Sequence, residues 1–413
     1  MNSAATGERF EVLDSWRGVC AIMVVIYHFI FIVDTPFLQN EFILNSYLFV
    51  DFFFVLSGFV VCHAYRDRIR DRRQFTGFLL RRIGRLWPLH LAILFAMMLG
   101  VMAINVIGYH PERLLIDAKS GNYSLRALLL NAFLLNSMGF YGSAWNGPAW
   151  SIGAEFYTYF LFALVVLTAR RKLLLVSSAL AVGAVAIIVV FAPAYMNSTA
   201  DFGYIRCIAG FFTGVGAYHL HAALRHRRLP FATPLELASL ALAAAFIVAA
   251  GRGPDKAHVL SVLAPLAFAL PILVFAREGG LASRLMRLDP LQALGRWSFS
   301  IYLIHMPVLV LAVSYGLWLH GDLAGIDLRR EVIVDGVAKQ LYDVGPVGAG
   351  VLLVLVVALV VALAALSFRL VEVPWRDRFA RLARVQEKPL RLLPSARMAP
   401  RYGAPVPVRV KRR

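Results

Sequence analysis

The sequence predicts an all-α integral membrane protein, a bundle of about ten transmembrane helices with both termini in the cytoplasm. Of the 413 residues, 60% are hydrophobic and only 16% are charged. A soluble chain of this length cannot bury so large an apolar fraction, because its core grows more slowly than its composition requires. Apolar runs also recur along the chain, and the basic residues gather in alternate turns between them.

The spans follow from the apolar runs, since a helix that crosses the hydrocarbon core needs about 20 mainly apolar residues. The predicted spans are residues 16–33, 44–64, 88–107, 150–169, 173–192, 203–221, 234–250, 258–276, 296–319 and 346–371. The stretch 124–138 is apolar but short, which predicts a partial or interfacial helix. Residues 1–375 then form a transmembrane domain. Residues 376–413 form a basic, proline-containing tail, predicted to be disordered near anionic headgroups.

Basic residues in the turns predict the orientation, because Lys and Arg concentrate on the cytoplasmic side. The basic segments are 65–85, 170–172, 221–228, 277–287 and the tail. The turns poor in basic residues are 34–43, 108–123, 194–202, 251–257 and 320–345. This alternation predicts a multi-pass protein of the inner (cytoplasmic) membrane. The basic residues of these turns also account for the net charge of +18. The lipid bilayer is therefore the expected partner, and nucleic acid is not.

The first predicted helix carries ionisable residues, which are costly in lipid and therefore mark candidate functional positions. Arg17 and His28 are eleven residues apart, which places them on one helix face about 16 Å apart. Asp14 lies one turn before Arg17 and can pair with it. Two interpretations stay open. The pair is either an anchoring arginine with a hydrogen-bonded histidine, or a site at which the histidine transfers protons.

A second cluster consists of Arg81, Arg82 and Arg85 in the segment FLLRRIGRLWP. Residues three and four apart share a helix side, so these guanidinium groups are expected to gather. Planar guanidinium groups suit phosphate oxygens. Snorkelling towards lipid headgroups is the alternative, although it accounts less well for so dense a set.

Other polar residues in the spans have more open interpretations. Glu155 lies near the outer end of its predicted helix, and at that depth it must be paired, protonated or facing water. Asp51 opens the segment VDFFFVLSGF, which is more typical of helix packing than of catalysis. His305 lies near the middle of span 296–319, and Glu372 suggests an interfacial ion pair. The three cysteines lack CxxC spacing, which favours buried apolar side chains over a metal site.

Taken together, the segments resemble the membrane-bound acyltransferase-3 family from about Arg9 to Arg376. The matching pieces, in chain order, are LDSWRG followed by His28, VDFFFVLSGF, FLLRRIGRLWP, WSIGAEFY, GRWSFSIYLIHMP and FRLVEVPWR. The resemblance implies transfer of an acyl group, usually acetyl, from cytoplasmic acyl-CoA to a hydroxyl of a cell-envelope or secreted carbohydrate. It also implies the standalone form, without an appended hydrolase-like domain. Acyl-CoA would be the donor substrate, with no resident cofactor.

The family motifs fall on particular residues of this chain. The Arg-x10-His motif falls on Arg17 and His28, the RxxR motif on Arg82 and Arg85, and the family glutamate on Glu155. Two positions depart from the family pattern. Ile152 replaces the usual leucine, and His90 stands where a tyrosine or similar residue is usual.

The resemblance and the residue chemistry together predict a mechanism. His28 would act as general base on the acceptor hydroxyl, with Glu155 or Asp14 orienting the imidazole. Arg81, Arg82 and Arg85 would dock the phosphates of coenzyme A, and Arg17 would hold a phosphate or polarise the thioester carbonyl. The rival hypothesis is a transporter or exporter of a polysaccharide or small molecule, which would release no free CoA. The sequence leaves the acceptor, the acyl chain and the oligomeric state open.

Overall fold

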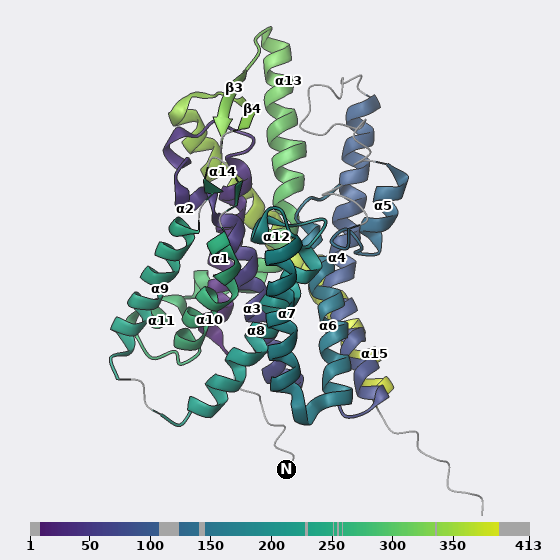
Figure 1. The fold of residues 1–413 in the computed structure, drawn as a ribbon. Helices are drawn as coiled ribbons and strands as arrows, with labels where there is room; N and C mark the ends of the chain where they lie inside the picture. Colours follow the sequence, from purple (N-terminus) through teal and green to yellow (C-terminus); the bar gives the residue numbers. More distant parts are fainter. Residues whose placement is uncertain are drawn as a thin grey trace, which may run out of the picture.

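Long helices run roughly side by side through the computed structural model of the chain (Figure 1). The structure describes residues 9–106, 124–139, 145–227, 230–250, 252–253, 256–257, 259–334 and 337–387. Within these residues, eight helical segments are long and apolar enough to cross a membrane. The prediction of an all-α, multi-pass membrane protein is therefore confirmed.

The long helices supply most of the structure. They are α1 (Glu11–Phe29), α3 (Phe49–Tyr65), α4 (Arg72–Val106), α6 (Ala149–Ala169), α7 (Leu173–Phe191), α8 (Gly203–Leu224), α9 (Ala232–Ala249), α12 (Asp289–Pro307) and α14 (Gly345–Ser367). Shorter helices connect or extend them. These are α2 (Glu41–Leu44), α5 (Leu125–Ala132), α10 (Ala264–Phe275), α11 (Leu281–Met286), α13 (Tyr315–Ala324) and α15 (Val373–Glu387). Wider π-helical turns, η8 (Val308–Ser314) and η9 (Phe368–Glu372), join α12 to α13 and α14 to α15.

Helix α4 begins well before its predicted span. The sequence indicates a span from residue 88, whereas the helix starts at Arg72 and runs for 35 residues, which is about 52 Å of helix. The arginine-rich stretch therefore belongs to a helix, and Pro88 lies inside it. Helix α15 packs along this extension, where Arg81 pairs with Glu387 through two bonds of 2.6 Å. The local apolar pattern gives no sign of this contact with α15, and the contact explains why α4 is longer than predicted.

Helix α15 also changes the picture of the C-terminal tail. The sequence predicts disorder from residue 376, but residues 376–387 are helical and continue the direction of the last span through η9. Gly84 of α4 lies directly against Phe379 of α15, because a Cβ at Gly84 would be 2.2 Å from the Phe379 Cβ. Residues 388–413 of the predicted tail lie outside the described residues.

The connections between the long helices agree with the sequence prediction in one place and differ from it in others. The stretch 124–138 contains α5, which has eight residues and is too short to cross a bilayer, as the sequence predicts. Segment 320–345 is not a simple turn. It holds an antiparallel hairpin of β3 (Arg329–Val334) and β4 (Val337–Tyr342). A smaller hairpin pairs β1 (Arg252–Gly253) with β2 (Lys256–Ala257). Neither hairpin is predicted by the apolar pattern.

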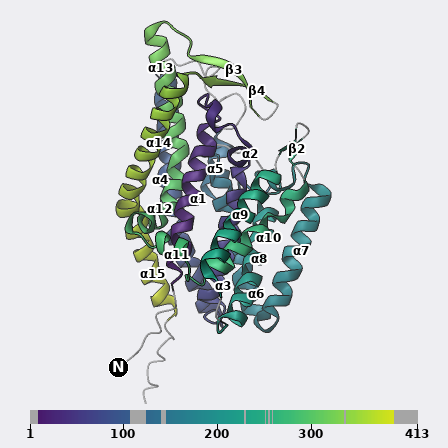
Figure 2. The ribbon, with the colours of Figure 1, turned by 90° about the vertical axis from the view of Figure 1, so that its left-hand side faces the viewer.

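Different elements lie at the two ends of the bundle. The β3–β4 hairpin and α13 lie at one end, while α15 lies at the other (Figures 1 and 2). The α15 end also carries the turn Arg170–Lys172, where the chain passes from α6 to α7. Arginines are frequent in α15 itself. The predicted orientation depends on basic residues such as these.

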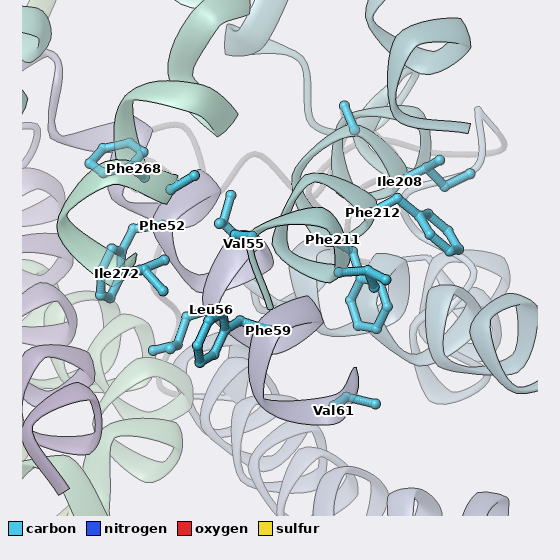
Figure 3. Close-up of a cluster of buried hydrophobic side chains, with 14 of the residues drawn as sticks. Phe52, Val55, Leu56, Phe59, Val61, Ile208, Phe211, Phe212, Phe268 and Ile272 are labelled. Atoms are coloured by element: carbon cyan, nitrogen blue, oxygen red, sulfur yellow. The ribbon is translucent and has the colours of Figure 1, made fainter. Parts of the chain in front are cut away.

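A dense aromatic core joins α3, α8 and α10. Figure 3 shows Phe52, Val55 and Phe59 of α3 beside Phe211 of α8 and Phe268 of α10. The phenylalanines at 59, 211 and 268 are at most 2% exposed.

The backbones of α3 and α8 meet directly at two glycines. A Cβ at Gly58 would be 1.8 Å from the carbonyl oxygen of Phe211, and one at Gly214 would be 1.9 Å from that of Val55. Small residues permit such close approach between membrane helices.

Replacing Gly214 with alanine is expected to lower the free energy of unfolding by about 1–3 kcal/mol, because the new methyl group has only backbone to displace. Gly216→Ala on the same helix is the matched control, since nothing lies within 4 Å of its Cβ position. Thermal unfolding of both purified variants in detergent measures the difference. Equal melting temperatures would contradict the close packing of α3 on α8.

Candidate functional site

A central cavity of about 90 Å³ lies inside the bundle, between α1, α3, α4, α6 and α12. Its apolar walls include Phe53, Leu56 and Phe299. Its polar lining comprises Arg17, Ser57, Arg82, Arg85, Ser151, Glu155, Tyr159, Ser298 and Tyr302. So many polar groups inside a membrane bundle mark this cavity as a candidate site rather than as packing space.

A larger cavity of about 360 Å³, here called the basic vestibule, adjoins the central cavity. Arg17, Arg85, Ser298 and Phe299 line both, so the two spaces meet at these side chains. The charged lining of the basic vestibule consists of Arg9, Asp14, Arg17, Arg85, Arg296, Glu372 and Arg376. Arginines outnumber acids in this list, which favours an anionic ligand.

The vestibule reaches the protein surface at the α15 end. The side chains of Arg9 and Arg376 are 59% and 45% exposed. Asp14 pairs with Arg9 at 2.9 Å and lies 3.7 Å from Arg17. Asp14 thus neutralises part of the charge at the rim.

A short chain of hydrogen bonds crosses the central cavity. The Tyr159 hydroxyl donates to Glu155 Oε1 at 2.5 Å, and Ser57 Oγ lies 2.8 Å from the same hydroxyl. Glu155 and Tyr159 are one turn apart on α6, so a single helix face presents both to the cavity. The Arg82 guanidinium lies 4.9 Å from the Tyr159 ring centroid. Glu155 is therefore hydrogen-bonded and shares the cavity with Arg17, Arg82 and Arg85.

The structure brings four of the predicted site residues together and separates the others. Arg17, Arg82, Arg85 and Glu155 all line the central cavity. Asp14 lies beyond Arg17 in the vestibule. Arg81 points to the other side of α4, where α15 holds it through Glu387.

His28 lies at a second centre, at the other end of α1. Its Nδ1 atom is 2.9 Å from the carbonyl oxygen of Val24 and 3.3 Å from Nε2 of His305 on α12. The two imidazole centroids are 4.9 Å apart. In the described part of the chain, no hydrogen bond or ion pair joins His28 to Glu155 or Asp14, and both acidic residues lie near Arg17 instead.

Tyr302 connects the two centres. Its hydroxyl accepts a hydrogen bond from Ser151 Oγ at 2.8 Å on the wall of the central cavity. Its ring centroid lies 5.8 Å from that of His305, which is fully buried. A path of packed side chains therefore runs from the central cavity through Tyr302 and His305 to His28.

Sequence reasoning missed several of these residues. Tyr159, Ser298 and Tyr302 were not singled out, because their residue types are common in membrane helices. The available signal was that Ser298 and Tyr302 lie in the matching segment GRWSFSIYLIHMP. Glu372 was expected in an interfacial ion pair, but it lines the vestibule and accepts a hydrogen bond from Ser300 at 3.0 Å.

A buried ion pair supports the site from outside it. Arg206 of α8 donates to both carboxylate oxygens of Asp51 at 3.0 and 2.6 Å, and also to the carbonyls of Tyr47 and Ser198. Both charged side chains are at most 1% exposed. The sequence did contain a signal for this pair, because Arg206 and Asp51 are charged residues in two different predicted spans. The packing role expected for Asp51 takes the form of this pair.

The donor atoms at the site suit anions better than metals. Among the residues that the structure describes, no group of three His, Cys, Asp or Glu side chains has the spacing of a metal site. Guanidinium groups dominate the vestibule, and they form paired hydrogen bonds with phosphate oxygens.

Comparisons with known proteins identify the family of the chain. The chain is 37% identical over 107 residues to "Protein 2 in picA locus" from Rhizobium radiobacter, an alignment that covers 26% of this chain and 53% of that protein. The chain thus spans about half the length of this curated relative. No solved structure matches significantly. The family model described as "Acyltransferase domain" matches residues 10–368. Because that match covers most of the 413 residues, the chain belongs to the acyltransferase-3 family.

Proposed function

We propose that the protein is an O-acyltransferase that moves an acyl group, most simply acetyl, from cytoplasmic acyl-CoA to a hydroxyl of a cell-envelope or secreted carbohydrate. The observation that carries this proposal is the basic vestibule, which leads from the protein surface to a narrower, mostly apolar cavity. Coenzyme A has the matching shape, with anionic phosphates at one end and a thin pantetheine arm at the other.

Donor docking divides the three predicted arginines into two groups. Arg85 lines both cavities and Arg82 lines the central one, so these two are proposed to bind the donor, with Arg17 beside them. Arg81 instead holds α15 against α4. Its contribution to donor binding is therefore proposed to be indirect, through the position of the helix that borders the vestibule.

The chemistry is acyl transfer from a thioester to a hydroxyl. His28 accepts the proton of the acceptor hydroxyl while the oxygen attacks the thioester carbon. The C–S bond then breaks, and the CoA thiolate leaves and takes up the proton. A hydroxyl is a weak nucleophile, so an adjacent base contributes about 10²–10⁴-fold to such a step. Glu155, held by Tyr159, balances the charge of the arginines in this scheme rather than orienting His28.

We also propose that ten spans cross the inner membrane with both termini in the cytoplasm. The apolar segment Ala149–Phe191 is interrupted at Arg170–Lys172, which supports two crossings rather than one. The shorter apolar stretch Val259–Phe275 supports a further crossing. The arginines near the vestibule support a cytoplasmic location for that end.

Arg85→Ala is expected to raise the KM for acetyl-CoA by about 10- to 100-fold, the loss expected for one charged hydrogen bond to phosphate. Arg81→Ala is the comparison variant, one turn away on the same helix but bonded to Glu387, and is expected to raise the KM by less because Arg81 acts only indirectly. The measurement is release of free CoA from labelled acetyl-CoA by purified protein in nanodiscs, with envelope glycans supplied.

Two outcomes would contradict these proposals. An equal rise in KM for both variants would refute the assignment of Arg85 to the donor. Failure of the wild-type protein to bind acetyl-CoA or to release CoA would favour a different donor, or the transport of a polysaccharide or small molecule.

A further inference from the structure

Helices α1 and α12 pack in parallel and share one register over most of their length. Gln292 Nε2 donates to Ser15 Oγ at 2.6 Å, a pair separated by 277 residues in the chain. His28 and His305 have the same separation. Gly18 and Gly295 keep that register between them, and a Cβ at Gly18 would be 2.6 Å from the Gly295 backbone nitrogen. The two histidines therefore meet because the whole helix pair is aligned.

The contacts of the His28 ring determine which nitrogen carries the proton. A backbone carbonyl accepts hydrogen bonds but cannot donate them. The Val24 oxygen, 2.9 Å from Nδ1, therefore requires a proton on Nδ1. In the neutral ring Nε2 is then unprotonated and able to act as a base. The structure shows no partner for Nε2 within the residues it describes.

His305 faces the same Nδ1 atom. Its Nε2 lies 3.3 Å away, and a protonated Nδ1 requires that this atom present its lone pair. His305 must then carry its own proton on Nδ1. The N–H group of His28 Nδ1 thus faces two acceptors, the carbonyl oxygen of Val24 and Nε2 of the neutral His305 ring.

We propose that His305 is a positioning residue that, together with the Val24 carbonyl, holds His28 in the tautomer whose Nε2 is the base. This inference rests on the proposed function, because it concerns the proton step of acyl transfer. When Nε2 takes the proton of the acceptor hydroxyl, His28 becomes an imidazolium. The lone pair of His305 Nε2 then faces the positive charge and stabilises it. After the C–S bond breaks, the same Nε2 returns its proton to the CoA thiolate.

The tautomer is measured independently of activity. Histidine labelled with ¹⁵N in the full chain in nanodiscs gives well-separated signals for protonated and unprotonated ring nitrogens. The His28 signals are assigned by their loss in His28→Gln. The expected result is a protonated Nδ1 and an unprotonated Nε2. A proton on Nε2 of neutral His28 would overturn the proposal, whether or not the protein transfers acetyl groups.

Kinetics test the role of His305 itself. His305→Leu, which removes the acceptor, is expected to lower kcat by about 10- to 100-fold with the KM for acetyl-CoA unchanged. His305→Gln keeps an acceptor at a similar reach and is expected to retain most of the activity. The control is His320→Leu, an exposed histidine on α13. Wild-type kcat in His305→Leu, or equal losses in the Leu and Gln variants, would refute a positioning role. Absence of turnover in wild-type protein would refute the proposed function instead and leave the tautomer result standing.

Discussion

Replacing His28 with alanine is expected to reduce kcat for acyl transfer by about two to four orders of magnitude, the usual contribution of a general base. The KM for acetyl-CoA is expected to stay near its wild-type value. Arg17 and Arg85, which are proposed to bind the donor, line the vestibule at the other end of α1, about 16 Å of helix away from His28. Initial rates of CoA release over a range of acetyl-CoA concentrations give both constants.

The control is His320→Ala, which removes an exposed histidine from α13. Size-exclusion profiles and melting temperatures establish that each variant folds. Full turnover in a well-folded His28→Ala protein would eliminate the general-base role. A large rise in KM with unchanged kcat would instead place the imidazole in donor binding.

Breaking the Asp51–Arg206 pair is expected to cause the largest loss of stability. Removal of one partner leaves a buried charge uncompensated, so Arg206→Met should destabilise the protein by about 3–5 kcal/mol. The guanidinium also satisfies the carbonyls of Tyr47 and Ser198, which lie on different segments from α8. The unfolding transition of the purified protein, followed by tryptophan fluorescence during titration with a denaturing detergent, measures the loss.

A double replacement separates the charge effect from packing. Asp51→Leu combined with Arg206→Met removes both charges and is expected to recover much of the stability lost by either single variant. Arg225→Met, at the exposed end of α8, is the control and should change stability by less than about 1 kcal/mol. Stabilities that simply add in the double variant would show that the two side chains do not act as a pair.

Composition and charge pattern were sufficient for the fold class, because lipid imposes a strong constraint on every span. They were insufficient where a second helix decides the outcome. The charge pattern placed residues 65–85 in a basic turn, since polar residues there obscure an apolar run, whereas residues 72–85 are helical. The helix forms because α15 covers it, and residues 376–387 of α15 were themselves assigned to a disordered tail. The hairpin of β3 and β4 was missed for a similar reason, since its backbone pairing leaves no apolar signature.

The site shows the same division. Arg17 and Glu155 were identified from residue type and depth, and Arg82 and Arg85 from their spacing and the family motif. All four do gather around one cavity. Which helix faces meet cannot be derived from one chain without tertiary contacts. Arg81 and Arg82 are adjacent in sequence, so their directions differ by about 100° around the helix axis. Only the packed structure decides that Arg82 faces the cavity, while Arg81 faces α15.

The common register of α1 and α12 restricts how related chains can change length. A one-residue insertion in α12 between Gly295 and His305 would turn His305 by about 100° and shift it by about 1.5 Å relative to the glycine contact. His28 would then face a different side chain, although every motif would still be present in the sequence. A matching insertion between Gly18 and His28 would restore the alignment. Insertions and deletions in these two segments are therefore tolerated only together, even though the segments lie 277 residues apart.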